Sequence, residues 1–206
     1  MISLSITDLT HEYNERLVFQ AVSFEFDGNC MSITGSNGSG KSTLTRIIAG
    51  LATPVEGCVT VAVDGQAVAR ENLRDIVGLV APDVQLYGEL SARENLEFLA
   101  TARSYPMGKS RIGEVLEQVG LAKRGNDPVR ELSSGLRQRA CFAAALLHEP
   151  LLLLLDEPST NLDELGIAMV HEVIHAQMTR GMVIIATNDV QEAALGQKTL
   201  DLGGRL

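Results

Sequence analysis

The stretch CMSITGSNGSGKSTLTRIIAGL, residues 30 to 51, contains the pattern that decides the fold of this chain. An apolar run from Cys30 to Ile33 is followed by the motif GxxxxGKS, from Gly35 to Ser42, and then by an amphipathic run that ends near Ala49. This order predicts a strand, a phosphate-binding loop and a helix. The glycines let the backbone curl so that successive amides face an anion, and the start of the helix adds a partial positive charge.

The residue types in this loop predict its chemistry. We expect Lys41 to reach the β- and γ-phosphates of a bound nucleotide, and the Ser42 hydroxyl to join the coordination shell of Mg2+. A chance glycine-rich turn is the alternative, but the flanking strand and helix patterns argue against it. The residues predicted to bind the nucleotide here are Gly35, Ser36, Asn37, Gly38, Ser39, Gly40, Lys41, Ser42 and Thr43.

A second informative stretch is PLLLLLDEPSTNLDELG, residues 150 to 166. The leucines from Leu151 to Leu155 form too short a run for a membrane helix and suit a strand buried on both faces of a parallel sheet. Asp156 and Glu157 then follow at the carboxyl end of the strand, where α/β sheets place their ligands. Asp156 is predicted to hold Mg2+ through water, and Glu157 to polarise the water that attacks the γ-phosphate.

Length, charge and hydropathy pattern exclude several classes of protein. The chain has 206 residues, 45% of them apolar and 21% charged, which predicts one compact domain. The formal net charge of −9 argues against a general nucleic-acid-binding surface, since such surfaces carry clustered Lys and Arg. No apolar run approaches the roughly 18 residues that span a bilayer, and the amino terminus shows no export signal. We therefore expect no nucleic-acid partner and no direct insertion into a membrane.

A phosphate loop and an acidic strand end also occur in kinases, GTPases and motor proteins, so they do not identify the class of nucleotide-binding protein. The stretch that distinguishes these classes is ELSSGLRQRACFAAALLHEP, residues 131 to 150. It resembles the signature segment of the ATP-binding cassette (ABC) family, usually LSGGQ followed by a basic helix and the acidic strand. Leu132 to Leu136 fill these positions and depart at the third and fifth letters. Ser133 and the amides of Ser134 and Gly135 lie at a predicted helix start and can bind a phosphate, although such a turn can also be a simple helix cap.

The resemblance extends along the whole chain and implies its fold. Members of the family have an α/β fold: a P-loop NTPase core with a mainly parallel sheet, an antiparallel β subdomain and an inserted helical subdomain. The chain would be a single ABC ATPase domain, residues 1–206, with the core at 1–81 and 140–206 and the helical subdomain at about 82–139.

Two positions depart from the family's usual residues. Most members carry a glutamine where the core meets the helical subdomain, and aligning VGLVAPDVQLYGELSARENL places Pro82 there, with Gln85 as the candidate substitute that senses Mg2+. Most members also carry a histidine where this chain has Asn188, and an amide can hydrogen-bond a γ-phosphate but cannot take a proton. The resemblance thus implies Glu157, Lys41 and Asn188 as catalytic residues, and Ser42, Asp156 and Gln85 as metal ligands.

One motif points to a different chemistry. HEVIH, residues 171 to 175, matches HExxH, in which two helical histidines bind zinc and the glutamate activates a water. A metalloprotease would need a third ligand, and the HxxGxxH continuation is absent because Met178 occupies the glycine position. We interpret the match as a coincidence on an amphipathic helix between the acidic strand and the strand MVIIAT.

The resemblance implies a mechanism that needs two subunits. Cassette ATPases act as head-to-tail pairs, as homodimers or with another ABC ATPase subunit, and each ATP lies between the Lys41 loop of one subunit and the Ser133 segment of the other. Tyr13 matches the aromatic residue that stacks on adenine, and STNLD, residues 159 to 163, resembles the loop that couples the two subunits. ATP, bound with Mg2+, closes the pair, and hydrolysis lets it open.

The leading hypothesis is therefore the ATP-hydrolysing subunit of an ABC transporter, cytoplasmic and peripheral on the cytoplasmic face of the inner or plasma membrane, where it binds separate membrane-spanning subunits. Its short single cassette resembles the haem-exporter ATPases of cytochrome c maturation. Two alternatives stay open: a soluble cassette ATPase serving iron-sulfur assembly or translation, and a low-turnover, nucleotide-gated module, which Asn188 and Pro82 support. The residues leave the cargo, the direction of transport and the identity of the membrane subunits undetermined.

Overall fold

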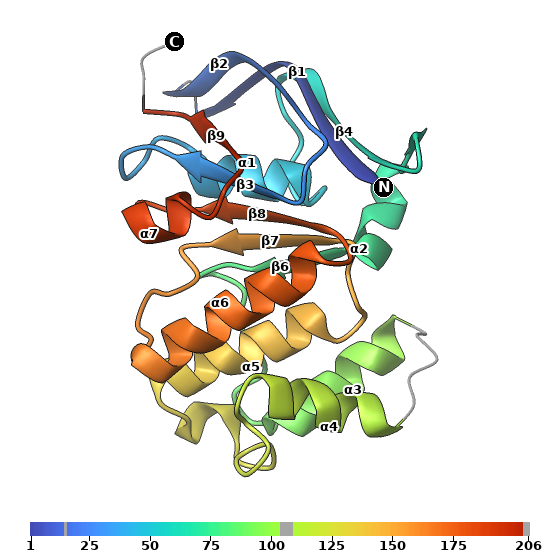
Figure 1. The fold of residues 1–206 in the computed structure, drawn as a ribbon, viewed down its shortest axis with the longest axis vertical. Helices are drawn as coiled ribbons and strands as arrows, with labels where there is room; N and C mark the ends of the chain where they lie inside the picture. Colours follow the sequence, from blue (N-terminus) through green and yellow to red (C-terminus); the bar gives the residue numbers. More distant parts are fainter. Residues whose placement is uncertain (15, 104–108, 204–206) are drawn as a thin grey trace.

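Two β-sheets and a set of helices make up the described part of the computed structural model, residues 1–14, 16–103 and 109–203 (Figure 1). The larger sheet is parallel, with the strand order β6-β7-β8-β3-β9. Its strands are β3 (Cys30–Thr34), β6 (Val77–Val80), β7 (Leu152–Asp156), β8 (Met182–Ala186) and β9 (Lys198–Asp201). The predicted α/β fold with a mainly parallel sheet is therefore confirmed.

The leucine run forms β7, between β6 and β8 in the parallel sheet. Successive side chains of a strand point to opposite faces of the sheet. Leu153 and Leu155 accordingly belong to one hydrophobic cluster, and Leu152 and Leu154 to the other. The run shows no alternation with polar residues because both faces of the sheet are covered.

The smaller sheet is antiparallel and has the strand order β2-β1-β4-β5. Its strands are β1 (Ile2–Tyr13), β2 (Arg16–Phe26), β4 (Glu56–Val63) and β5 (Gln66–Ala67). Leu4 and Ile6 on β1 share a buried cluster with Leu44 of helix α1 (Lys41–Ile48) and with Leu152 and Leu154 of β7. Helix α1 therefore lies between the two sheets (Figure 1), and the predicted antiparallel β subdomain is confirmed.

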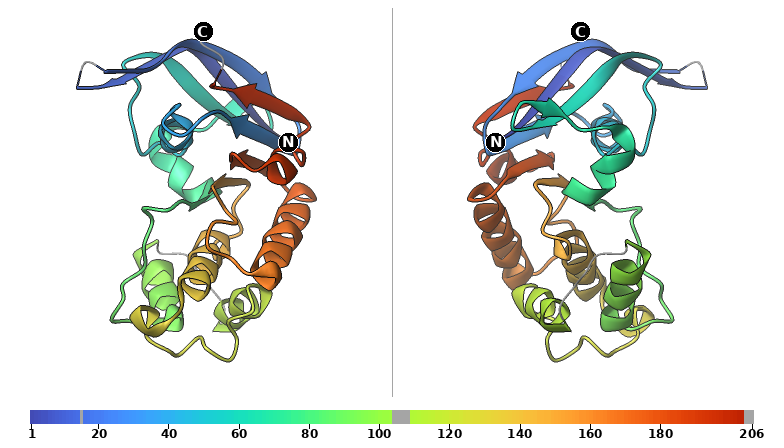
Figure 2. Two further views of the ribbon diagram at one scale, coloured as in Figure 1. Left: turned by 90° about the vertical axis from the view of Figure 1, so that its left-hand side faces the viewer. Right: turned by 90° about the vertical axis from the view of Figure 1, so that its right-hand side faces the viewer.

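The opposite face of the parallel sheet is covered by α5 (Ser134–Leu146) and α6 (Glu164–Met178), which contribute Phe142 and Val170 to the second cluster. Helices α3 (Ala92–Ala102) and α4 (Lys109–Gln118) lie at the end of the molecule away from the antiparallel sheet (Figure 2). The remaining helical segments are η1 (Arg70–Asn72), α2 (Leu73–Ile76), η2 (Val129–Glu131) and α7 (Val190–Ala193). Within the described ranges, no helix combines the length and apolar character needed to cross a bilayer.

Helix α5 connects the helical region to the sheet, since it packs against α3, α4 and β6. Its N-cap is Ser133, whose side chain accepts a hydrogen bond from the Leu136 N–H at 3.3 Å. The predicted boundary between residues 139 and 140 falls inside this uninterrupted helix. One element thus belongs to both predicted parts, and the division into core and helical subdomain stays a prediction.

Candidate active site

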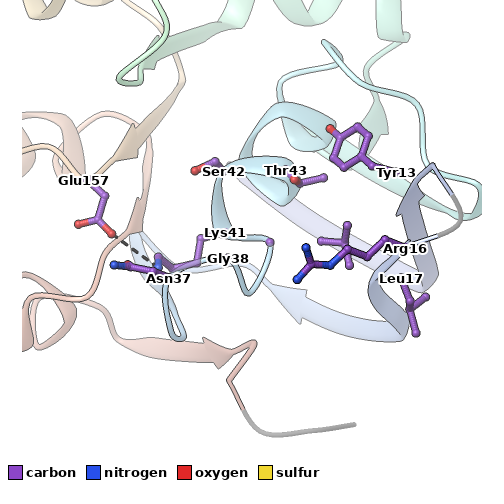
Figure 3. Close-up of a pocket in the computed structure, with 11 residues that line it drawn as sticks. Tyr13, Arg16, Leu17, Asn37, Gly38, Lys41, Ser42, Thr43 and Glu157 are labelled. Atoms are coloured by element: carbon purple, nitrogen blue, oxygen red, sulfur yellow. Dashed lines mark ion pairs between the residues drawn. The ribbon is translucent and has the colours of Figure 1, made fainter.

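A cavity of about 520 Å³ opens between the phosphate loop and the β1–β2 hairpin (Figure 3). Glu157 lies on one side of it, Tyr13 and Arg16 lie on the other, and Lys41 lies between them. Of the residues predicted to bind nucleotide or to act in catalysis, the lining contains Tyr13, Asn37, Gly38, Gly40, Lys41, Ser42, Thr43 and Glu157. The structure therefore brings together residues from three distant parts of the sequence.

The phosphate loop adopts a conformation that requires glycine. Gly35, Gly38 and Gly40 have φ values of 145°, 84° and 101°, in the region that residues with a Cβ rarely adopt. At Gly40 a Cβ would also lie 2.5 Å from the Cγ1 atom of Val18 on β2. Gly40 is the N-cap of α1 and offers no side-chain cap, so the first amides of this helix remain available to an anion.

The Lys41 ammonium is buried and held by oxygen atoms from three segments. Its Nζ donates to the Gly35 carbonyl oxygen at 2.8 Å and to Asn188 Oδ1 at 3.0 Å. It lies 3.6 Å from Glu157 Oε1, an ion pair drawn in Figure 3. The Asn188 amide also donates through Nδ2 to Asn37 Oδ1 at 2.6 Å. Lys41 therefore contacts both of the other residues predicted to be catalytic, and Asn188 links the loop after β8 to the phosphate loop.

Asp156 and Ser42 have the chemistry of a magnesium site. Asp156 ends β7 with only 2% of its surface exposed, and the Ser42 hydroxyl lies near its carboxylate. Burial raises the pKa of Asp156 above its usual value, an effect that the nearby Ser42 hydroxyl opposes. Its Oδ1 atom has no hydrogen-bond partner within the described chain. A buried carboxylate oxygen without a partner, beside a hydroxyl, fits the oxygen ligands and ordered waters that Mg2+ prefers.

Glu157 is held in an unusual backbone conformation. Its φ is 49°, in the left-handed region that costs a non-glycine residue free energy and often marks a functional site. Its N–H donates to the Ala186 carbonyl oxygen at the end of β8, at 2.8 Å. This bond between neighbouring strand ends fixes the backbone from which the Glu157 side chain reaches the cavity.

The signature segment and Gln85 lie away from this cavity. Ser133, Ser134 and Gly135 are at the start of α5, and Ser134 lines a separate hollow together with Pro82 and Gln85. The lining of the Lys41 cavity contains none of these residues. Gln85 therefore lines a different hollow from Ser42, and its role as a metal ligand stays a prediction.

The cavity lining also contains residues that the sequence reasoning missed: Arg16, Leu17 and Val18. Arg16 pairs with Tyr13 across the turn between β1 and β2, which brings a guanidinium to the same wall as the tyrosine ring. The sequence signal for Arg16 is the alternating pattern on the two strands that contain Tyr13 and Arg16, since paired residues of a hairpin face the same side of a sheet.

The HEVIH motif lies on α6, as predicted from its position between two strands. His171 is half-buried and His175 is exposed. Over residues 1–14, 16–103 and 109–203, no group of three or more His, Cys, Asp or Glu side chains is arranged to hold a metal ion.

Comparisons with known proteins point to one family. The ABC transporter family matches residues 19–160. The cytochrome c biogenesis ATP-binding export protein CcmA of Pseudomonas aeruginosa is 35% identical over 204 residues, which cover 97% of this chain and 99% of that protein. A solved ATP-binding subunit of an ABC transporter has a TM-score of 0.80 and 28% identity, covering 94% of this chain and 82% of that one. The solved structure of cbiO1 from Clostridium perfringens, part of the ABC transporter complex cbiONQ, has a TM-score of 0.74 and 27% identity. The match covers 93% of this chain and 80% of that one.

Proposed function

The chain belongs to the ABC transporter family, and on that premise we propose that it hydrolyses ATP in the cavity beside Lys41, with Glu157 activating the attacking water. The family resemblance drawn from the sequence motifs is confirmed, and with it the class of protein: an ATP-binding transporter subunit with ATPase activity. The observation that carries the finer proposal is the contact of Lys41 with both Asn188 and Glu157.

In the proposed reaction, residues of this chain bind the phosphates, orient them and accept a proton. The first amides of α1 and the Lys41 ammonium hold the β- and γ-phosphates and stabilise the charge of the transition state. Asn188 orients the γ-phosphate through its amide, and Glu157 accepts the proton of the attacking water. Mg2+ held through Ser42 and Asp156 would neutralise phosphate charge when bound.

We propose that two chains form the working unit. The Ser133 segment starts a helix whose first amides can bind an anion, yet it lies outside the cavity of its own chain. In a head-to-tail pair this segment would meet the ATP bound by a second copy. This arrangement supports a homodimer, or a pair with another ABC ATPase subunit, in which ATP contacts both halves.

The test is the rate of Mg-ATP hydrolysis over a range of protein concentrations. We expect the turnover per chain to rise with concentration and to level off once the chains are paired. A turnover per chain that stays constant at every concentration would contradict the pair. ATP binding, measured by calorimetry because the chain has no tryptophan, is expected at all concentrations. ATP binding without turnover would favour the nucleotide-gated module instead.

We further propose that the transport is export. The relative from Pseudomonas aeruginosa is an export protein of cytochrome c biogenesis, and the two chains match over almost their full lengths. That likeness supports a role for this chain in the same process, bound at the cytoplasmic face of the membrane to separate membrane-spanning subunits. The likeness to cbiO1, which is part of a transporter complex, supports such an assembly.

An apolar groove is the surface that we assign to a helical segment of those membrane subunits. It has a volume of about 280 Å³ and lies between α1, β6 and the helical region, where Leu51, Leu79, Leu86 and Leu99 contribute to its lining. Tyr87 follows Leu86 in the sequence, and Phe98 precedes Leu99. Both aromatic rings are exposed, and they stack edge to face with their centroids 5.3 Å apart.

The Tyr87 ring is presented by a rigid support. Buried Asn95 accepts a hydrogen bond from the Tyr87 N–H at 2.8 Å and donates to the Tyr87 carbonyl oxygen at 3.0 Å. These two bonds fix the backbone of Tyr87, so little backbone entropy is lost when a partner binds its exposed ring. Exposed aromatic residues of this kind often dominate the energy of protein interfaces.

Replacing both Tyr87 and Phe98 by alanine is expected to weaken the affinity for the membrane subunits by roughly 30-fold, the effect of losing about 2 kcal/mol at an interface hot spot. ATP affinity should be unchanged, because neither ring lines the Lys41 cavity. The measurement is co-isolation with the membrane subunits from detergent-solubilised membranes. Leu165→Ala, an exposed apolar residue on α6, is the control, and equal loss in both variants would contradict the assignment.

A further inference from the structure

A tight turn follows β6, at the position where the family usually has its glutamine. The N–H of Val84 donates to the Ala81 carbonyl oxygen at 3.0 Å, which closes a turn with Pro82 and Asp83 at its centre. Proline favours the first central position of such a turn because its ring fixes φ near the required value. Pro82 therefore builds the turn, and Asp83 is the polar residue that the turn presents.

The sheet places this turn beside the predicted magnesium site. β6 and β7 are parallel neighbours, with Val80 paired to Leu155. The next residues along the two strands are Ala81 and Asp156, so the turn begins at the strand end adjacent to the Asp156 carboxylate. The carboxyl ends of parallel strands are where α/β proteins bind their ligands.

Helix α1 holds Asp83 on the same side as its magnesium-binding residue. Arg46 lies four residues after Ser42, so the two side chains share one face of the helix. Arg46 Nη2 lies 2.9 Å from Asp83 Oδ1, while the Ser42 hydroxyl lies near the Asp156 carboxylate. Two adjacent turns of one helix thus each face a carboxylate, one from the end of β7 and one from the turn after β6.

The charges of these groups influence one another. The Arg46 guanidinium holds the pKa of Asp83 below its usual value. Asp156 has its pKa raised first by burial, and the nearby Asp83 charge adds to the rise. Carboxylates that follow two neighbouring strands, one of them with a buried oxygen that lacks a partner in the described chain, form an arrangement that a divalent cation would relieve.

We propose that Asp83 is a second carboxylate of the Mg2+ site, acting through a metal-bound water in place of the glutamine that this chain lacks. The inference rests on the proposed ATPase function and deepens it. Asp83 is a positioning residue that orients a water in the coordination shell of the metal. Because Asp83 lies in the turn that connects β6 to the helical region, this segment then responds to metal binding. Gln85, the other polar side chain near this turn, lines two hollows whose linings contain neither Ser42 nor Asp156.

The test compares ATP affinity in EDTA with ATP affinity in saturating Mg2+, by calorimetry, for the full chain. For Asp83→Asn we expect the gain in affinity that Mg2+ confers to fall roughly tenfold, as when a group that hydrogen-bonds a metal ligand is removed. Metal-free ATP affinity should stay the same or rise, since the variant removes a negative charge near the phosphates. Binding of Mn2+ to the ATP complex, followed by electron paramagnetic resonance, should weaken in parallel.

Two variants separate the proposal from a simpler structural role. Arg46→Met keeps the carboxylate but removes the group that holds it beside the Ser42 face of α1, so the Mg2+ gain should fall by clearly less than in Asp83→Asn, while the melting temperature falls slightly. Asp75→Asn removes an exposed carboxylate from α2, before β6, and should change neither quantity. Equal loss of the Mg2+ gain in Asp83→Asn and Arg46→Met, or no loss in Asp83→Asn, would overturn the proposal. Absence of ATP binding by the unmodified chain would instead refute the proposed function.

Discussion

Replacing Glu157 by glutamine is expected to lower ATP turnover by about 100-fold or more while ATP binding persists, because a positioned general base contributes at least that factor to a hydrolysis. The amide has nearly the shape of the carboxylate, so the backbone at φ 49° and its hydrogen bond to Ala186 are preserved. What is lost is the group that takes the proton of the attacking water. The measurement is steady-state phosphate release, with ATP affinity determined on the same preparation.

The matched control for this prediction is Glu164→Gln, which removes an exposed carboxylate at the start of α6. It should hydrolyse ATP at the original rate. We also expect the Glu157→Gln chain to accumulate as ATP-bound pairs, since ATP joins two chains and is no longer cleaved. Gel filtration with ATP would detect this species. Turnover close to the original in Glu157→Gln would remove Glu157 from its proposed role.

Replacing Lys41 by methionine is expected to weaken ATP affinity by roughly 10- to 100-fold, since a hydrogen bond between charged groups contributes about 1.5 to 3 kcal/mol. The methionine side chain fills similar space, but it cannot bind the phosphates, and it leaves Asn188 Oδ1 without its donor. Calorimetric titration with ATP measures the effect, and a melting curve confirms that the variant is folded.

Lys123→Met is the control for the Lys41 variant, because it removes an exposed positive charge outside the cavity. Its ATP affinity should match the original. If Lys41→Met bound ATP as tightly as the control, the loop around Gly35 would not be the phosphate site. The cavity would then need a different occupant.

Features with a local cause could be predicted from the sequence. The phosphate loop requires glycines at fixed positions. The unbroken apolar run of the strand Leu152–Asp156 indicates that both of its faces are buried. The α/β fold and the antiparallel sheet followed from the family resemblance. Tyr13, Lys41 and Glu157 were chosen from motifs, and the structure brings them to one cavity, while their roles stay predictions.

Features that depend on side-chain direction could not be predicted from the motifs alone. Aligning the segment after β6 places Pro82 where the usual glutamine would lie and leaves Gln85 as the candidate substitute. The alignment does not describe the turn at Pro82, which leaves Asp83 against Arg46, while Gln85 lines other hollows. Arg16 was missed for a similar reason, because its place in the cavity comes from pairing with Tyr13 across a hairpin.

The hydrogen bond from the Asn188 side-chain amide to the Asn37 side-chain oxygen has a consequence for a cell whose acidity varies. An imidazole at this position would gain a charge as the pH falls through about 6.5, and its contacts would change with it. The asparagine keeps the same donors and acceptors under acid stress and in alkaline growth. We therefore expect the hydrogen bonds of this junction to depend on a bound phosphate and to stay the same as the surroundings acidify.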